Sequence, residues 1–299
     1  MYHEPVLLNE CLEALALNPS GIYVDVTFGG GGHSRAILER LGAGRLVGFD
    51  QDADALCNQP DDDRFVFVRQ NFIYLKRFLR YYDMLPVQGI LADLGVSSHQ
   101  FDVAERGFST RFEADLDMRM DQQGGLTAQD VLNTYSESAL YRIFHEYGEV
   151  RNANKLTEAI VRARKVAPIK TVSQLKEAIK SCVFKEKEHQ YLAQVFQALR
   201  IEVNGELDAL RQLLELSADV LAPGGRLAVI SYHSLEDRLV KNYIAHGKFD
   251  GEADKDVYGN ILGTKLRPVH RKAITASAEE LIRNTRSRSA RSSARPQHC

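Results

Sequence analysis

The stretch that decides the fold reads Val24-Asp25-Val26-Thr27-Phe28-Gly29-Gly30-Gly31-Gly32-His33-Ser34. An apolar, β-branched run ends here in four glycines, and a helical pattern with Ile37, Leu38 and Leu41 on one face follows. Glycines let the main chain approach a ligand closely, and the start of a helix presents free N–H groups. The stretch therefore predicts a strand, a ligand-binding loop and a helix.

Other short apolar runs alternate with helical patterns on both sides of this stretch. Including the first, they span residues 22–26, 46–49, 65–68, 90–92 and 227–231. Such alternation predicts an α/β fold with a doubly wound (Rossmann-like) parallel sheet. Only helical patterns occur over residues 109–205, so we expect an inserted all-helical domain that interrupts a sheet domain formed by residues 1–108 and 206–299.

The next strand ends in Gly48-Phe49-Asp50, nineteen residues beyond Gly31. An acidic side chain at this point can accept hydrogen bonds from both ribose hydroxyls of a nucleoside. A plain glycine turn, and a helix cap at Asp50, are the structural alternatives. Within a β-α-β frame the two features together favour nucleoside binding.

The kind of nucleoside follows from what the loop lacks. The dinucleotide-binding fingerprint Gly-x-Gly-x-x-Gly fits poorly, because Ser34 stands where its third glycine would be. No Gly-Lys-Ser/Thr occurs, which excludes the phosphate-binding loop of nucleotide hydrolases. Asp25 precedes the glycines, and Asp50 and Asp93 end the second and fourth strands. Carboxylates and aromatic faces suit the sulfonium cation of S-adenosyl-L-methionine. That cofactor is favoured, with a nicotinamide-dependent dehydrogenase as the alternative.

Further candidates follow the ends of the other strands. Asp93 can hold the amine of the cofactor's methionine or accept a proton from a target amine, and it is the candidate catalytic residue. Phe72 can stack on adenine, or pack in the core. Gln100 has capping-box spacing to Ser97, so closing a helix is its alternative role. After the fifth strand, Ser234 and Asp237 are expected to cap a helix while His233 and Arg238 face the cleft; a structural role is the alternative for His233.

Composition and charge bound the class of protein. The chain has 44% hydrophobic and 26% charged residues and no apolar run of about 18 residues, the length that a membrane span needs. No secretory signal is recognised, and the four cysteines are scattered. We therefore expect a soluble cytoplasmic protein with reduced thiols and without a metal site or a membrane partner.

The charges are unevenly distributed although the net charge is only −2. Residues 151–187 hold ten Lys and Arg against three Glu, and residues 265–295 hold nine against two. These stretches favour a polyanionic partner, with solvated helix faces as the alternative. The basic candidates are Arg151, Lys155, Arg162, Arg164 and Lys165 on the insert, with Arg286, Arg288 and Arg291 near the end.

Several segments together resemble the bacterial MraW-type (RsmH) methyltransferases. In chain order they are His3-x-Pro5-Val6-Leu7-Leu8-x-Glu10, the 27–34 glycine loop, residues 93–100, 105–109 and 116–121, Phe196-Gln197-Ala198-Leu199-Arg200-Ile201-x-Val203-Asn204, residues 222–227 and His233-Ser234-Leu235-Glu236-Asp237-Arg238. The resemblance covers nearly the whole chain. It implies a class I S-adenosylmethionine methyltransferase that modifies the 4-amino group of a cytosine in the decoding region of 16S ribosomal RNA, within the small ribosomal subunit.

The resemblance also implies roles for individual residues. Cofactor contacts are expected at Gly31, Gly32, His33, Asp50, Phe72, Asp93 and Gln100. Substrate contacts are expected at Arg200, Asn204, His233 and Arg238, and the helical insert is expected to recognise RNA. A non-catalytic RNA-binding factor in ribosome assembly is the alternative outside the enzymes, and a homo-oligomer is left open.

Two segments depart from the family pattern. The family usually ends in an apolar strand, whereas residues 290–295 are polar, so the sequence leaves the closing strand open. An arginine that often precedes the Phe-Gln-Ala segment is replaced here by Ala193-Gln194-Val195. Any RNA contact of that arginine is not carried over.

Overall fold

The chain is described by a computed structural model over residues 5–183, 185–259, 262–269, 274–284, 287 and 289–296. It divides into two compact units. One joins Met1–Gly95 to Leu207–Cys299, and the other spans Val96–Glu206. In the part of the chain that the structure describes, no helix has both the length and the apolar character needed to cross a membrane.

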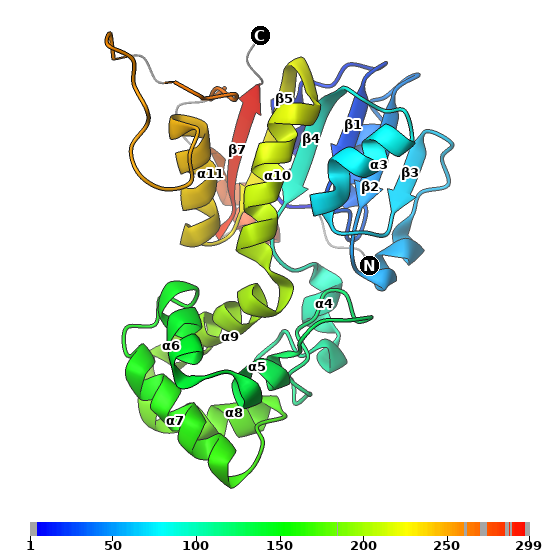
Figure 1. Cartoon of the computed structure of the whole chain (residues 1–299). Coiled ribbons are helices and arrows are strands. Elements are labelled where there is room, and N and C mark those ends of the chain that lie inside the picture. Colours follow the sequence, from blue (N-terminus) through cyan, green and yellow to red (C-terminus); the bar gives the residue numbers. More distant parts are fainter. Residues whose placement is uncertain are drawn as a thin grey trace. The chain divides into compact units, whose positions relative to one another are not determined.

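The first unit is built on a seven-stranded sheet in the order β3-β2-β1-β4-β5-β7-β6 (Figure 1). Five strands run parallel: β1 Ile22–Asp25, β2 Arg45–Phe49, β3 Phe65–Val68, β4 Val87–Asp93 and β5 Leu221–Ser231. The short strands β6 Ile274–Thr275 and β7 Arg291–Pro296 add antiparallel pairs at one side. All five strands expected from the sequence are present, and the predicted doubly wound α/β sheet is confirmed.

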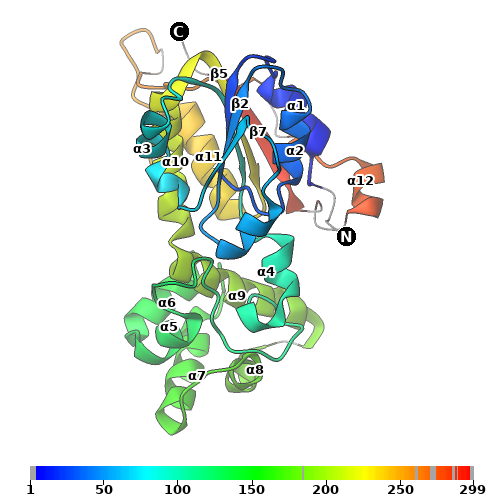
Figure 2. The same ribbon diagram turned by 90° about the vertical axis from the view of Figure 1, so that its right-hand side faces the viewer.

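Helices cover both faces of this sheet (Figure 2). On one face lie α1 Leu8–Leu15, α2 Gly32–Leu38 and α12 Ala278–Arg283; on the other lie α3 Leu75–Tyr81, α10 Glu206–Val220 and α11 Ser234–His246. The first face buries a core in which Leu15 and Ile37 pack with Leu46 and Leu91 of the strands. The main-chain N–H of Leu7 donates to the carboxylate of Glu280 over 2.8 Å, so the two ends of the described chain are joined on this side.

The polar closing segment forms a strand after all. β7 pairs with β5 from Ser231 opposite Arg291 to Arg226 opposite Pro296. The ladder uses main-chain groups, which every residue other than proline supplies in full, and the small side chains of Ser292 and Ser293 are buried beside it. An apolar pattern is therefore not required at this position, and that is why the sequence left it open.

The second unit is a helical core. Its helices are α4 Ser98–Asp102, α5 Ala128–Thr134, α6 Glu137–Glu146, α7 Ala153–Val166, α8 Val172–Ile179 and α9 Glu188–Asn204. Leu132, Leu140, Phe144, Leu156 and Leu199 are among its buried residues. The periodic apolar positions of the sequence therefore face a common core, as expected for amphipathic helices.

This unit begins at Val96, before the boundary at residue 109 that the sequence suggests. The guanidinium of Arg106 explains the difference, because it donates to the carbonyl oxygens of Arg119 and Met120 over 3.0 and 3.1 Å. The N–H of Met118 in turn donates to the carbonyl of Arg106. The segment before residue 109 is thus bonded to the helical unit.

Candidate active site at the carboxyl edge of the sheet

The glycine loop joins β1 to α2, and two of its glycines are required by the backbone or by packing. Gly31 has φ of 73°, in the left-handed region that favours glycine, and an added Cβ would lie 2.9 Å from the ring of Phe28. At Gly32 an added Cβ would lie 2.4 Å from Cγ of Pro5. The loop is therefore a stretch of bare main chain packed tightly between its neighbours.

Side chains from outside the loop hold it in place. Gly29 donates its N–H to Oδ2 of Asp50 over 2.7 Å, and its carbonyl accepts from the amide of Asn58 over 2.9 Å. The carbonyl of Gly30 accepts from the guanidinium of Arg35 over 2.8 Å, and Arg35 also donates to the carbonyl of Asn58. These bonds fix the direction of the main-chain groups before any ligand binds.

Asp50 lies just past β2 and is partly exposed. Its two carboxylate oxygens accept one main-chain N–H each, from Gly29 at 2.7 Å and from Asp52 at 2.9 Å. Burial raises the pKa of Asp50 to about 6, and these two hydrogen bonds oppose that rise. Because an ionised carboxylate has about four acceptor sites, Asp50 retains capacity for the two ribose hydroxyls.

Asp93 ends β4, and its side chain is 24% exposed. Its Oδ1 accepts from the hydroxyl of Tyr232 over 2.7 Å, and its main-chain N–H donates to Oγ1 of Thr27 over 2.6 Å. Burial raises the pKa of Asp93 to about 6, which the nearby His33 imidazole and the Tyr232 hydrogen bond oppose. Burial, and then the charge of Asp93, raise the pKa of Tyr232, so its hydroxyl stays a proton donor.

His33 and Asp25 lie behind this edge and are almost fully buried. One ring nitrogen of His33 donates to the carbonyl of Val6 over 3.0 Å, and the other lies 3.9 Å from Oδ2 of Asp93. Asp25 is 1% exposed and accepts from the hydroxyl of Ser34 and the N–H of Thr27. The chain itself therefore encloses the carboxylate of Asp25 and supplies its hydrogen bonds, and an influence of this carboxylate on a bound cation stays a prediction.

Phe72 opens the short 3₁₀ helix η2 Phe72–Tyr74 just past β3, and its side chain is half-buried. Asn71 caps this helix by accepting from the N–H of Ile73. Phe72 is thus held at the carboxyl edge of its strand. Stacking on adenine stays a prediction.

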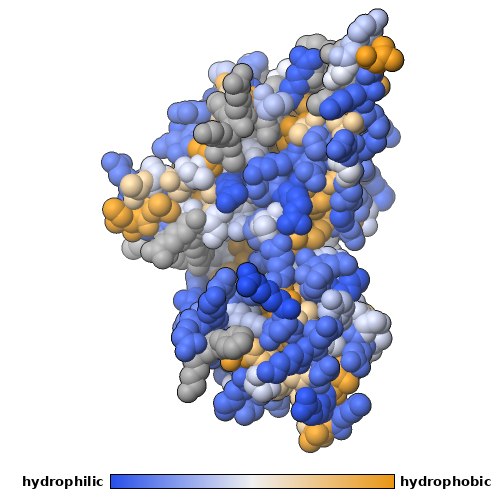
Figure 3. Space-filling view, turned by 90° about the vertical axis from the view of Figure 1, so that its left-hand side faces the viewer, coloured by the Kyte–Doolittle hydropathy of each residue, from blue (hydrophilic) through white to orange (hydrophobic). Residues whose placement is uncertain are grey.

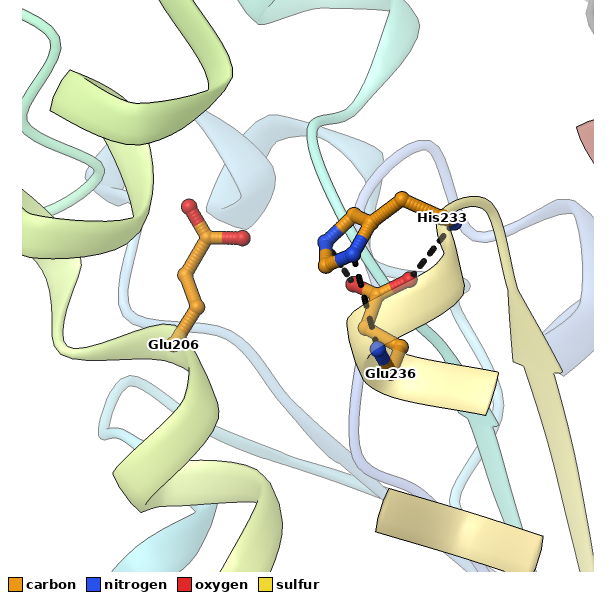
Figure 4. Close-up of side chains that lie close together, drawn as sticks. All are labelled: Glu206, His233 and Glu236. Atoms are coloured by element: carbon orange, nitrogen blue, oxygen red, sulfur yellow. Dashed lines mark hydrogen bonds and ion pairs between the residues drawn. The ribbon is translucent and has the colours of Figure 1, made fainter. Parts of the chain in front are cut away.

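The start of α11 differs from the expectation. His233, rather than Ser234, is the N-cap: its ring accepts from the N–H of Glu236 at 3.4 Å, and the Glu236 carboxylate accepts from the N–H of His233 (Figure 4). Asp237 does not take part in the cap because its carboxylate binds Lys241 and Arg291 instead. His233 therefore has a structural role as a cap, and its contact with substrate stays a prediction. Arg238 is exposed on the first turns of the helix.

The candidates in the second unit are tied to their own surroundings. Gln100 is 4% exposed and closes the capping box with Ser97 that its spacing suggests. Asn204 accepts from the N–H of Met120 and donates to the carbonyl of Met118, each over 2.8 Å. Arg200 forms a two-bond ion pair with Glu206 at 2.9 and 3.0 Å. Ligand contacts of these three residues stay predictions.

The basic residues of α7 fall into two groups. Lys155 donates to the carbonyl of Ser181 and Arg164 to that of Leu132, so both are used inside the unit. Arg162 and Lys165 are exposed on the same helix. Among the remaining candidates, Arg151 is exposed beside α7 and Arg291 lies on β7, whereas Arg286 and Arg288 lie outside the described residues.

The sequence analysis missed four side chains that build the site. Tyr232 could have been found, because it directly follows a predicted strand and must lie at the same edge as Asp93. Thr27 lies within the quoted stretch, but its bond to Asp93 depends on strand pairing. Arg35 and Asn58 act on the loop through contacts that no local pattern encodes.

The fold is that of a doubly wound α/β protein, and its carboxyl edge holds two partly exposed carboxylates, Asp50 and Asp93, beside a bare glycine loop. Such a donor set fits a ligand that carries ribose hydroxyls and a positive charge. A sequence profile of the MraW methylase family matches residues 1–294, and the chain belongs to this family. It is therefore a methyltransferase, and the dehydrogenase alternative is wrong.

Individual relatives are similar over nearly the full chain. Proteins of Bacteroides fragilis (strain YCH46) and Christiangramia forsetii named "Ribosomal RNA small subunit methyltransferase H" are 55% and 54% identical over 291 residues, which is 97% of this chain and 95% and 96% of theirs. Among solved structures, an rRNA methylase of Streptococcus thermophilus aligns with a TM-score of 0.41 at 12% identity, over 98% of this chain and 94% of that one. The N-methyltransferase NodS of Bradyrhizobium japonicum aligns with a TM-score of 0.40 at 8% identity, over the same shares.

Proposed function

We propose that this protein transfers a methyl group from S-adenosyl-L-methionine to the exocyclic 4-amino group of a cytosine in the decoding region of 16S ribosomal RNA. The observation that carries the proposal is the family match over residues 1–294, with relatives of the same length named as small-subunit ribosomal RNA methyltransferases. We infer that the reaction takes place in the cytoplasm, on the small ribosomal subunit.

The carboxyl edge supplies the residues that would hold the cofactor. Asp50 would accept hydrogen bonds from the ribose hydroxyls, and Phe72 would stack on the adenine. The main chain of Gly31 and Gly32 would line the bottom of the binding pocket. Asp93 lies where the methionine part of the cofactor and the target amine would meet. S-adenosyl-L-methionine supplies a methyl group that its sulfonium already activates, so the residues mainly bind and orient.

Asp93 has the geometry to orient the target amine. The nitrogen lone pair of cytosine is conjugated into the ring, and a carboxylate that accepts an amine hydrogen draws the nitrogen toward a tetrahedral shape. The donor would supply the methyl group and keep the C–S electron pair, leaving as S-adenosyl-L-homocysteine. The nitrogen would become positive as it gains the N–C bond and would then pass its surplus proton to solvent water. Tyr232 and Thr27 hold Asp93 in one orientation during this change.

We assign recognition of the RNA to the helical unit, Val96–Glu206, and methyl transfer to the sheet unit. A base inside structured RNA must be unstacked before it can react, and cations on the protein must hold the flanking phosphates. The exposed Arg162 and Lys165 of α7 suit that role. Arg151, Lys155 and Arg164 are further candidates on this unit. Arg200 and Asn204, and His233 and Arg238 on the first unit, are candidate substrate contacts.

Transfer of tritium from labelled S-adenosyl-L-methionine to immature small subunits tests the proposal. The expected result is incorporation into 16S ribosomal RNA, with N4-methylcytosine found in the decoding region by mass spectrometry of nuclease fragments. Binding of the subunit without any incorporation at saturating cofactor would favour the non-catalytic assembly factor. Incorporation at another base or atom would retain the class of enzyme and overturn the substrate assignment.

A further inference from the structure

A cavity of about 590 Å³ opens on the first unit between the start of α11 and the strands β6 and β7. Its lining includes Tyr232, Arg238, Lys241, Asn242, Thr275 and Arg291. Figure 3 views the molecule from the side on which α11 lies in Figure 1, and hydrophilic side chains gather over this face. A cavity lined in this way suits a polar ligand.

The cavity carries more positive than negative charge. Three of its lining residues are cations, Arg238, Lys241 and Arg291, whereas one, Asp237, is an anion. Asp237 is 7% exposed, and one of its oxygens, Oδ2, accepts both from Lys241 Nζ at 2.6 Å and from Arg291 Nη1 at 3.1 Å. Lys241 and Arg291 thus share a single carboxylate, which leaves this pair with an excess of one positive charge that an anion would neutralise.

Asp237 also fixes the two cations in position. Its other oxygen, Oδ1, has no hydrogen-bond partner among the described residues, so both cations converge on one atom. An ammonium has three N–H donors and a guanidinium five. Each group therefore keeps donors after it has bonded to Asp237, and its side chain remains about half exposed, 48% for Lys241 and 55% for Arg291. One cation would be enough to neutralise Asp237, so the second cation is available to a further anion.

The position of the cavity indicates which anion it receives. Tyr232 lines the cavity and donates its hydroxyl to Asp93, the candidate that orients the target amine. Ser231, the last residue of β5, also lines the cavity, so the cavity opens at the same edge of the sheet as Asp93, and a nucleotide whose base lay at Asp93 would have its flanking phosphates near this edge. Arginine and lysine are the side chains that most often bind such phosphates.

We propose that this cavity binds a backbone phosphodiester that flanks the methylated base, held by Lys241 and Arg291 with Asp237 as their positioning residue. The inference rests on the proposed function, because it assumes that the base reaches Asp93. It adds a substrate subsite on the sheet unit, separate from the basic helix of the insert.

The test compares K241Q/R291Q with the control K248Q. Lys248 makes the same 2.6 Å contact to an aspartate, Asp254, and lies outside the cavity lining. Binding of a decoding-region RNA fragment is measured over a series of salt concentrations. We expect K241Q/R291Q to bind about tenfold more weakly at low salt, with a salt slope smaller by about one. K248Q should match the wild type.

Two further measurements keep the result interpretable. The single variant K241Q changes only an exposed helix position, so it should fold normally and show part of the same loss of affinity. The dissociation constant of S-adenosyl-L-methionine should be unchanged in all variants. If K241Q and K241Q/R291Q bind RNA with the affinity and slope of K248Q, the subsite is overturned.

The outcomes separate this inference from the proposed function and from free phosphate. A wild type that binds RNA through Lys241 and Arg291 but transfers no methyl group overturns the proposed function alone. If inorganic phosphate at constant ionic strength raises the unfolding midpoint of the wild type, but not that of K241Q/R291Q, while RNA binding is equal in both, the cavity binds free phosphate and the RNA subsite is wrong.

Discussion

Asp25 and Asp93 are residues of the same type at the same kind of position, the last residue of a buried parallel strand, yet their surroundings differ. Asp25 is 1% exposed and accepts from Ser34 and Thr27 of its own loop. The side chain of Asp93 is 24% exposed and is held by Tyr232. Burial raises the pKa of both carboxylates.

The difference separates structure from chemistry at one edge of the sheet. A carboxylate that the chain encloses and satisfies stabilises the loop, whereas one that is desolvated but still reachable favours a cationic ligand. Asp50, partly exposed and bonded to the glycine loop, lies between these two cases. Substitutions at the three positions should therefore affect different properties of the protein.

The largest effect is expected at Asp93. Asp93→Ala should lower methyl transfer at saturating cofactor by about 100-fold, because the target amine loses its orienting acceptor. The tritium transfer assay measures this effect. Asp208→Ala, which removes an exposed carboxylate paired with Arg211, is the control. A rate within threefold of the wild type would show that Asp93 does not orient the amine.

At Asp50 we expect a loss of cofactor affinity. Asp50→Ala should weaken S-adenosyl-L-methionine binding by about 1.5–3 kcal/mol, the typical contribution of a hydrogen bond to a charged group. Isothermal titration calorimetry measures the dissociation constant of S-adenosyl-L-methionine in each variant. Asp52→Ala, at a neighbouring carboxylate that accepts from the N–H of Asp54 over 3.1 Å, should have a smaller effect. An unchanged dissociation constant for Asp50→Ala would remove the ribose assignment.

At Asp25 the expected loss is in stability. Asp25→Ala leaves the hydroxyl of Ser34 and the N–H of Thr27 without their acceptor and should cost about 1–3 kcal/mol of unfolding free energy. Asp25→Asn, which keeps an acceptor oxygen, is the matched variant for chemical denaturation. If Asp25→Ala instead keeps its stability and loses cofactor binding, Asp25 is a ligand contact and the contrast with Asp93 fails.

The pH dependence should follow the raised pKa values of Asp50 and Asp93. Both lie at about 6 in the folded protein, above the ordinary value of 3.8, so the folded state binds more protons than the unfolded state between these values. Each of these groups should therefore increase the cofactor-free stability by about 1 kcal/mol as the pH falls from 7 to 5. Cofactor affinity should decrease over the same range, because the ligand needs the ionised carboxylates.

Unfolding midpoints and calorimetric titrations at pH 5, 6 and 7 test this. Asp93→Asn should flatten both profiles relative to the wild type, since the amide does not titrate. Groups with lowered pKa values, such as Asp117 and Asp130, stay ionised in both states over this range and do not contribute. If the cofactor affinity does not depend on pH, the ionised forms of Asp50 and Asp93 do not contact the cofactor.

The smallest effect is expected on the helical unit. Arg162→Gln with Lys165→Gln should reduce the salt slope of RNA binding by about one or two without changing cofactor affinity. Arg164→Gln is the comparison on the same helix, since its guanidinium is bonded to the carbonyl of Leu132. It should lower the stability of the unit more than the salt slope. If the salt dependence of RNA binding is the same in all variants, α7 is a solvated surface that does not contact RNA.

Much of the fold could be predicted because its strands and helices follow from the local spacing of apolar and capping residues. The five parallel strands and the capping boxes at Ser97 and Thr171 follow from periodicity and spacing. The site was predictable where a residue ends a strand, as Asp50 and Asp93 do. The cap at His233 is local, since its partner Glu236 is three residues away, but spacing alone also allowed Ser234 as the cap. The strand β7 was not predictable, because it depends on pairing with β5, far away in the sequence. For the same reason Lys241 and Arg291 gave no signal of a shared cavity.

The contacts of Pro5, Val6 and Leu7 have a practical consequence. Pro5 would meet a Cβ at Gly32, Val6 accepts from His33, and Leu7 donates to Glu280. Residues 5–7 are thus in contact with the glycine loop, where we propose that the cofactor binds, and with α12. A purification tag fused before these residues would disturb their contacts with the glycine loop. Kinetic measurements should therefore use protein from which the tag has been cleaved.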